Sequence, residues 1–256
     1  MNVHLEVPAR PIALVTGVGR KRGIGAGIGR KLASLGWDLA LTYWSAYDKR
    51  MPWGREGDET GEVVEELKRH GKRVISIEAD LETTSAAEQI FRVVTKQLGP
   101  VTALVLSHCE SVNSGILDTS VESFERHFAV NARASWQLVR EFALQIPAGG
   151  GKIIALTSDH TAGNLPYGAS KGALDRIVLA AAREFVQLGI TANVVNPGPV
   201  DTGWMDPDTR AESLHRQPGK SLGTPERIAN IVAFLLSSDG AWINGQLIKA
   251  DGGFSA

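Results

Sequence analysis

A tyrosine and a lysine four residues apart, Tyr167 and Lys171, are the side chains in this sequence best placed to do chemistry. Within a helix this spacing puts both side chains on one face. A neighbouring ammonium favours phenolate over phenol and lowers the pKa of a tyrosine from its usual value of about 10. Such a tyrosine can donate or accept a proton at the oxygen of an alcohol or a carbonyl. Taken alone, however, such a pair is more often a surface feature than a catalytic one.

Two further polar residues could complete a site of this kind. Ser158 follows the predicted strand 152–157, at the end where open α/β sheets have their ligand crevice, and its hydroxyl could hydrogen-bond the reacting oxygen. Asn131 belongs to an apolar stripe of a predicted helix, where an amide must find partners. It is either a satisfied polar group of the core or an amide that orders a water near Lys171 for proton relay.

Glycines are concentrated in the segment 16–25, TGVGRKRGIG, between the first predicted strand and the first predicted helix. Glycines in such a turn let backbone N–H groups approach a pyrophosphate at the N-terminus of the helix. The alternative is a glycine-rich turn that serves only close packing. The position of the turn in a strand–loop–helix unit favours dinucleotide binding.

The charges near this loop favour NADP(H) over NAD(H). The 2′-hydroxyl of NAD is usually held by an acid at the end of the second strand, but here no acid follows that strand before Asp48. The loop itself carries three cations, Arg20, Lys21 and Arg22. Such cations suit the 2′-phosphate of NADP, and the alternative is that they are solvated loop charges.

These residues lie in a chain that alternates short apolar runs with longer amphipathic stretches. The apolar runs predict buried parallel strands at 12–16, 39–42, 74–77, 103–107, 152–157, 192–196 and 246–250. The amphipathic stretches predict helices at 28–35, 59–70, 86–98, 121–146, 168–188 and 225–237. This alternation predicts a single doubly wound, Rossmann-type α/β domain over residues 1–256, with a seven-stranded parallel sheet flanked by helices. The irregular segment 199–222 is expected to be a substrate lid.

Composition excludes several classes of function. The 256 residues include 27 Lys and Arg against 28 Asp and Glu, so the chain lacks the basic excess of a general nucleic-acid surface. No apolar run is long enough to span a membrane, and the first ten residues lack the apolar centre of a signal peptide. The single cysteine, Cys109, excludes an intrachain disulfide and is typical of a reducing compartment. We therefore expect a soluble, cytoplasmic protein.

Together these motifs resemble the classical short-chain dehydrogenase/reductase family, and in particular its 3-oxoacyl-[acyl-carrier-protein] reductases. The resemblance covers nearly the whole chain. It depends on seven ordered features: Thr16-Gly17 with Gly23-Ile24-Gly25, Asp80-Leu81, Asn131, Ser158, Tyr167-Gly168-Ala169-Ser170-Lys171, Asn196-Pro197-Gly198-Pro199 and Asp251-Gly252-Gly253.

The resemblance implies a role for each residue of the expected site. Tyr167 would be the general acid/base, and Lys171 would lower its pKa and hold the nicotinamide ribose. Ser158 would orient the substrate oxygen, and Asn131 would anchor a proton-relay water. The residues implied to bind NADP(H) are Gly17, Arg20, Arg22, Gly23, Ile24, Gly25, Asp80, Leu81, Ser107, Lys171, Pro197, Val200 and Thr202. The family also implies a small-molecule substrate and a homotetramer packed through 121–146, 168–188 and the C-terminal segment, with no nucleic-acid or membrane partner.

Three departures from the family pattern bear on this expectation. The first two motif glycines, Gly17 and Gly23, enclose five residues instead of the usual three. The segment 107–110 reads Ser-His-Cys-Glu where the family has Asn-Asn-Ala-Gly, so larger side chains and a negative charge would narrow the cofactor space. Ser158 lies nine residues before Tyr167 instead of about thirteen, which leaves a short loop at 159–166. Thr157 and Thr161 are candidate substitutes if the serine misses the reacting oxygen.

The favoured hypothesis is an NADP(H)-dependent oxidoreductase that interconverts a carbonyl and a secondary alcohol by hydride transfer. The alternative is a non-catalytic NADP-binding sensor or scaffold protein on the same fold, which the altered segment 107–110 and the short loop would explain. A metal site at 108–110 and His160 is a third possibility, but neighbouring side chains at a strand end point to opposite faces, and we predict none. The sequence leaves acyl-carrier thioesters, steroids, sugars and small ketones open as substrates.

Overall fold

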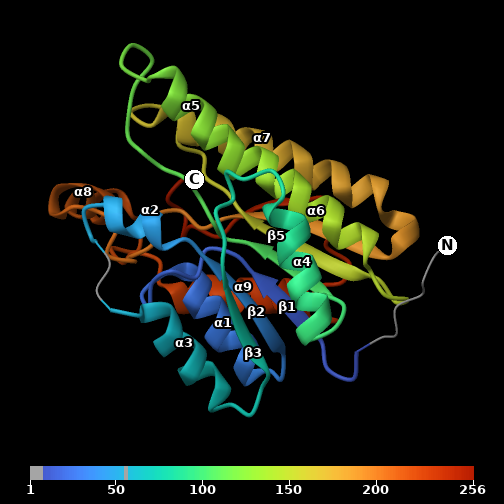
Figure 1. Cartoon of the computed structure of the whole chain (residues 1–256). Coiled ribbons are helices and arrows are strands. Elements are labelled where there is room, and N and C mark those ends of the chain that lie inside the picture. The colour runs from blue at the N-terminus through green and yellow to red at the C-terminus, as the bar shows by residue number, and fades with distance from the viewer. Residues whose placement is uncertain (1–7, 55–56) are drawn as a thin grey trace.

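A seven-stranded parallel sheet forms the centre of the computed structural model, which describes residues 8–54 and 57–256 (Figure 1). The strands are β1 (Ile12–Val15), β2 (Asp38–Tyr43), β3 (Val74–Glu78), β4 (Ala103–Leu106), β5 (Gly151–Leu156), β6 (Ile190–Asn196) and β7 (Leu247–Lys249). Their order is β3-β2-β1-β4-β5-β6-β7, and every neighbouring pair is parallel. The predicted doubly wound α/β sheet is confirmed.

Helices cover both faces of the sheet (Figure 1). One face packs against α4 (Ala86–Gln97), α6 (Ala134–Leu144) and α7 (Leu165–Glu184), and the other against α1 (Ile24–Ser34), α3 (Glu59–Lys68) and α9 (Pro225–Leu236). The central strand β1 shows why its residues are apolar throughout. Ile12 and Leu14 enter the first of these cores and Ala13 and Val15 the second, because successive side chains of a strand point to opposite faces.

Several helical regions differ from the prediction. Helix α1 begins at Ile24, four residues before the predicted start, so the glycine loop leads directly into its first turn. The predicted helix 121–146 consists of α5 (Val121–His127), a π-helical turn (Phe128–Arg133) and α6. A short helix that was not predicted, α2 (Ser45–Arg50), follows β2.

The segment 199–222 is not irregular throughout, because it contains the helix α8 (Pro207–Arg216). Local signals explain this helix: the Asp206 side chain caps its N-terminus by accepting from Thr209 N at 2.8 Å, and Pro207 occupies the first turn. None of its residues is buried, so the sequence has no apolar stripe here that would have predicted the helix.

In the part of the chain that the structure describes, no helix is both long and apolar enough to cross a membrane.

Candidate active site

The sequence-predicted residues meet where the loops after β1, β4 and β5 leave the carboxyl ends of three neighbouring strands. The sheet order reverses between β1 and β4, since β2 and β3 lie to one side of this pair and β5 to β7 lie to the other. Open α/β sheets bind their ligands at such a reversal point, because the loops diverge there and leave a crevice.

Tyr167 and Lys171 both lie in the first half of α7, and their side chains are close in space. The ammonium Nζ of Lys171 is 5.8 Å from the centroid of the Tyr167 ring. It also donates to the carbonyl oxygens of Leu156, at 2.9 Å, and His108, at 3.4 Å. Leu156 is the last residue of β5, and His108 lies just after β4. The lysine side chain is therefore held between the ends of these two strands, close to the tyrosine ring.

The structure raises the pKa of Tyr167, whereas the sequence predicted a lowered one. Burial is the main cause, because a phenolate would lose its hydration in this position, and the neighbouring Cys109 acts in the same direction. A side-chain hydrogen bond with Ser158 opposes the shift without reversing it. Burial in turn lowers the pKa of Lys171. The structure therefore presents Tyr167 as a protonated phenol, which is the form that donates a proton.

The short loop 159–166 does not separate Ser158 from Tyr167. The two side chains share the hydrogen bond just described, and Ser158 Oγ also accepts from His160 N at 3.2 Å. The loop can be short because it lies directly against the first turn of α7, where a side chain on Gly168 would collide with the carbonyl oxygen of His160. The structure therefore brings Ser158 and Tyr167 together despite the short loop.

Asn131 is fully buried in the π-helical turn, and its side-chain amide is hydrogen-bonded to Glu110 and Ser170. Oδ1 accepts from Glu110 N at 2.7 Å, and Nδ2 donates to Glu110 O and to Ser170 Oγ, both at 2.9 Å. Ser170 Oγ in turn donates to the carbonyl oxygen of Tyr167. The amide thus connects the segment after β4 to the turn that carries the tyrosine.

The glycine loop packs against the segment that follows β4. Gly17 has a φ of +75°, and a Cβ there would lie 2.7 Å from both His108 Cα and Ser107 O, so only glycine fits. Gly23 is the N-cap of α1 and supplies no side-chain cap. Because no side chain in the described part of the chain caps α1, this helix end is suited to an anion such as a pyrophosphate.

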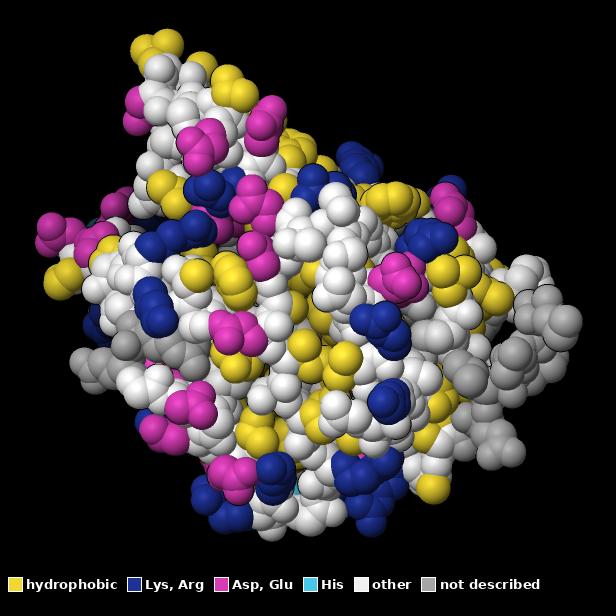
Figure 2. Space-filling model, viewed as in Figure 1, with side chains coloured by type: hydrophobic (Ala, Val, Ile, Leu, Met, Phe, Trp, Pro, Cys, Tyr) yellow, Lys and Arg dark blue, Asp and Glu magenta, His cyan; other side chains and the backbone are white. Residues whose placement is uncertain are grey.

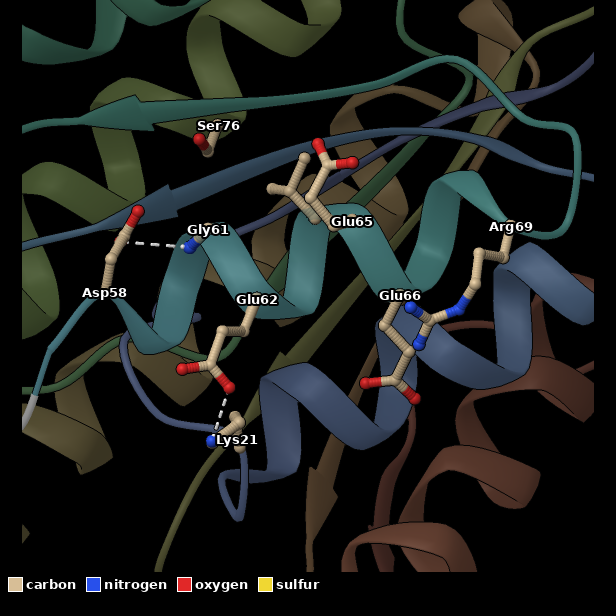
Figure 3. Close-up of a pocket in the computed structure, with 9 residues that line it drawn as sticks. Lys21, Asp58, Gly61, Glu62, Glu65, Glu66, Arg69 and Ser76 are labelled. Carbon is tan, nitrogen blue, oxygen red and sulfur yellow. Dashed lines mark hydrogen bonds and ion pairs between the residues drawn. The ribbon is translucent and has the colours of Figure 1, made fainter.

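Two of the three loop cations already have acidic partners. Lys21 Nζ lies 2.6 Å from a carboxylate oxygen of Glu62 on α3, and Figure 3 shows the two side chains pointing toward one another. Arg22 Nη2 lies 3.6 Å from Asp201, which follows β6. The Lys21 ammonium is thereby turned toward α3, whereas the Arg22 side chain is 70% exposed and its ion pair is long.

The third cation, Arg20, lies over an indole ring, with its guanidinium carbon 4.4 Å from the centroid of Trp53. Trp53 Nε1 donates to Asp48 Oδ1 at 3.1 Å. Helix α2 returns Asp48 to the glycine loop, where its carboxylate occupies the space that a side chain on Gly19 would need. Asp48, the first acidic residue after β2, therefore lies against the glycine loop. Its distance along the chain does not reveal this contact.

The residues at 108–110, which differ from the family pattern, make contacts within the protein. The Glu110 carboxylate is buried but ion-paired with Arg50 of α2, so its charge is compensated, although burial still raises its pKa. His108 Nδ1 hydrogen-bonds Thr16 Oγ1 at 2.7 Å, and burial together with the nearby Lys171 ammonium lowers the pKa of His108 to about 3. This histidine is neutral and joins the ends of β1 and β4.

The remaining predicted cofactor residues lie at the same edge of the sheet. Asp80 Oδ1 accepts from Glu82 N at 2.9 Å in the turn before α4, and Ser107 N donates to Thr16 Oγ1 at 3.0 Å. Ile24 is half-buried, and the others are buried: Gly25, Leu81, Pro197, Val200 and Thr202.

Sequence reasoning missed the contribution of α2 and the residues after it. Tyr47 lies under the Arg50 guanidinium, 5.0 Å from the ring centroid, and its hydroxyl donates to Ser111 O at 3.5 Å. The Trp53 ring meets the Trp204 ring of the 199–222 segment edge-on, with centroids 5.3 Å apart. The three aromatic residues at 44, 47 and 53 in the stretch after β2 were the available signal.

Comparisons with known proteins span nearly the whole chain. Residues 17–255 match a family model described as enoyl-(acyl carrier protein) reductase. The uncharacterized oxidoreductase YjdA of Bacillus subtilis is 34% identical and covers 95% of this chain and 96% of its own length. The NADPH-dependent aldehyde reductase-like protein of Arabidopsis thaliana chloroplasts is 32% identical, and the match covers 99% of this chain and 100% of the relative's length. The crystal structure of a blue fluorescent protein from a metagenomic library in complex with NADPH superimposes with a TM-score of 0.87, at 34% identity and with 97% and 99% covered.

Proposed function

Because this chain belongs to the classical short-chain dehydrogenase/reductase family, we propose that it is an NADP(H)-dependent oxidoreductase that interconverts a carbonyl and a secondary alcohol by hydride transfer. The observation that carries the proposal is the half-buried phenol of Tyr167, hydrogen-bonded to Ser158 and with the Lys171 ammonium 5.8 Å from the centroid of its ring. Two of the similar proteins support NADPH as the cofactor: the metagenomic blue fluorescent protein was crystallised with NADPH, and the Arabidopsis relative is named as an NADPH-dependent aldehyde reductase-like protein.

The residues present fit this cofactor. The uncapped N-terminus of α1 behind the glycine loop suits its pyrophosphate, and Arg20 and Arg22 are the cations available for a 2′-phosphate. Lys171 has two of its three N–H donors on carbonyl oxygens, so one is left for a ribose hydroxyl. When bound, the reduced nicotinamide supplies the hydride.

The protein's own part in the reaction is to hold the substrate oxygen and move a proton to it. In the reductive direction the Ser158 hydroxyl and the Tyr167 phenol would donate to the carbonyl oxygen. Tyr167 would then release its proton to that oxygen as negative charge develops on it, and Lys171 would stabilise the phenolate that remains. The raised pKa of Tyr167 keeps the donor protonated at neutral pH.

The substrate and the assembly extend the proposal. A 3-oxoacyl group is one candidate substrate, in line with the acyl-carrier description of the family model.

We expect a single cytoplasmic domain with residues 199–222 as its lid and a homotetramer as its assembly. Apolar side chains are exposed where copies would pack, Trp136 on α6 to 50% and Trp242 before β7 to 98%. Figure 2 shows hydrophobic side chains on the face that carries α5 and α6. Sedimentation velocity checks the assembly, and a monomer at micromolar concentration would contradict it.

Fluorescence titration with NADPH and with NADH, followed by turnover on a panel of ketones, aldehydes and 3-oxoacyl thioesters, tests the proposed function. Tyr167→Phe is expected to lower turnover by about 10²–10⁴-fold and to leave the Kd for NADPH within about twofold. NADH is expected to bind at least about tenfold more weakly, a difference of about 1.4 kcal/mol.

Two outcomes would overturn the proposal in different ways. Tight NADPH binding without turnover on any carbonyl would favour the non-catalytic sensor or scaffold. Binding of neither cofactor would leave only the fold.

A further inference from the structure

The stripe of α7 that carries Tyr167 and Lys171 continues to an acid one turn further on. Asp175 is four residues after Lys171, so the two side chains lie on one face of the helix. Its carboxyl group is half-buried, and Oδ1 has no hydrogen-bond partner among the described residues. Burial raises the pKa of Asp175, and the Lys171 charge opposes that shift.

A second buried polar atom without a partner lies beside this carboxyl group. Thr157 is 4% exposed, and its hydroxyl makes no well-directed hydrogen bond within the described part of the chain. It is nevertheless close enough to Asp175 to lower the pKa of that carboxyl group. Thr157 directly follows Leu156, whose carbonyl oxygen accepts from Lys171 Nζ at 2.9 Å. The hydroxyl, the carboxyl group and the ammonium therefore share one polar region at the end of β5.

Two neighbouring groups raise the pKa of Lys171 against the effect of burial, first Cys109 and then Asp175. The Lys171 ammonium faces Tyr167 from its own helix, and it faces the neutral His108 and the thiol of Cys109 from the segment after β4. Burial raises the pKa of the Cys109 thiol, which keeps the thiol uncharged at neutral pH. From β5 the ammonium is bound by the backbone carbonyl of Leu156. Among these groups Asp175 is the one with a carboxyl group, and it raises the pKa of Lys171.

We propose that Asp175, which lies beside Thr157, is a positioning residue that keeps the buried Lys171 ammonium charged and in place near Tyr167. A charged group buried without a counter-charge is costly, and a carboxylate one helical turn away offsets part of that cost. The two unpartnered oxygens also suit a buried water that would join Thr157 to Asp175, because polar atoms in such positions are usually satisfied by solvent. The inference deepens the proposed function, since it concerns the lysine of the same site.

The direct test is the titration of Lys171 itself, followed by NMR of the full chain labelled with ¹³C at the lysine Cε. The Lys171 resonance is identified by its absence from Lys171→Met. In Asp175→Asn, Lys171 is expected to titrate about one pH unit or more lower, because the carboxylate that favours the ammonium is gone. Asp175→Glu is expected to restore most of the shift. Glu184→Gln, at the other end of α7, is the matched control and should leave Lys171 unchanged.

An unchanged Lys171 titration in Asp175→Asn would overturn the inference. If that variant fails to fold, Asp175→Ser is measured instead and is held to the same expectation. Turnover supplies a second readout where the enzyme is active: the loss of rate at alkaline pH should begin at lower pH in Asp175→Asn. An inactive wild-type enzyme would contradict the proposed function, yet the NMR titration would still decide the role of Asp175.

Discussion

The side-chain amide of Asn131 binds both backbone polar groups of Glu110, accepting from its N–H at 2.7 Å and donating to its carbonyl oxygen at 2.9 Å. The same amide donates to Ser170 Oγ, which donates to the carbonyl oxygen of Tyr167. Four residues from three parts of the chain are thereby joined in one hydrogen-bonded series. Whatever water Asn131 also holds, its amide fixes the geometry of the turn that carries the catalytic candidate.

Asn131→Ala should therefore cost stability as well as rate. It removes three hydrogen bonds and leaves the N–H and C=O of the buried Glu110 without partners, for which we expect a loss of about 2–4 kcal/mol in the free energy of unfolding. Urea denaturation followed by circular dichroism measures the loss. Gln97→Ala, at the exposed end of α4, is the control and should change stability by less than about 0.5 kcal/mol. A loss below about 1 kcal/mol in Asn131→Ala would mean that the Glu110 backbone finds other partners.

The sheet and the tyrosine–lysine pair could be predicted because each follows from local spacing. β1 and β4 are runs of four apolar residues that are buried on both sides, and such runs are typical of central parallel strands. The spacing of Tyr167 and Lys171 requires only a helix to bring the side chains together, and α7 provides it.

What the sequence did not reveal depends on contacts between distant parts of the chain. α2 has only six residues, too few for an apolar period, and its main interaction joins Arg50 to Glu110, sixty residues away. The predicted direction of the Tyr167 pKa shift was wrong for a related reason. A neighbouring cation can be inferred from spacing, but burial is a property of the folded site, and here burial has the larger effect.

The buried His108 should make the stability of the protein depend on acid. Its pKa is about 3 in the folded protein and about 6.5 when unfolded, so between these values the unfolded chain binds a proton that the folded protein does not. Stability should therefore fall as pH falls below about 6.5, by up to about 1.4 kcal/mol per pH unit from this residue. Urea denaturation at pH 7, 6 and 5 measures the slope.

In His108→Asn this part of the slope should disappear, whatever the variant's stability at pH 7. His70→Asn, at an exposed position just after α3, should keep the wild-type slope. Equal slopes in wild type and His108→Asn would show that the folded protein takes up the proton at position 108.

The contact between Trp53 and Trp204 should restrain the 199–222 segment. Their rings meet edge-on at 5.3 Å, an arrangement that contributes about 0.5–1.5 kcal/mol. Trp204→Ala should therefore speed tryptic cleavage after the exposed Arg210 or Arg216 by about fivefold under conditions where cleavage follows local opening. Leu35→Ala removes an apolar side chain that is 55% exposed at the end of α1 and should not change the rate. If the two variants are cleaved equally fast, the tryptophan contact does not hold the segment closed.

The ion pair between Arg22 and Asp201 yields the sharpest test of cofactor preference. Of the two paired cations, Lys21 is held 2.6 Å from Glu62, whereas Arg22 is 3.6 Å from Asp201 and largely exposed. Arg22 is therefore the more available to a 2′-phosphate, and Arg22→Gln should raise the Kd for NADPH by about 5–10-fold, or about 1–1.4 kcal/mol. NADH lacks this phosphate, so its Kd should stay within about twofold.

The partners of the two cations extend the test in opposite directions. Asp201→Asn should tighten NADPH binding, since it releases Arg22 from its carboxylate, and fluorescence titration measures the change. Lys21→Gln is the matched control and should have a smaller effect than Arg22→Gln, because its ammonium is already neutralised by Glu62. Equal weakening of NADPH and NADH in Arg22→Gln would place the guanidinium near a group that both cofactors share, such as the pyrophosphate. The preference for NADP would then have to come from Arg20, whose guanidinium lies over Trp53.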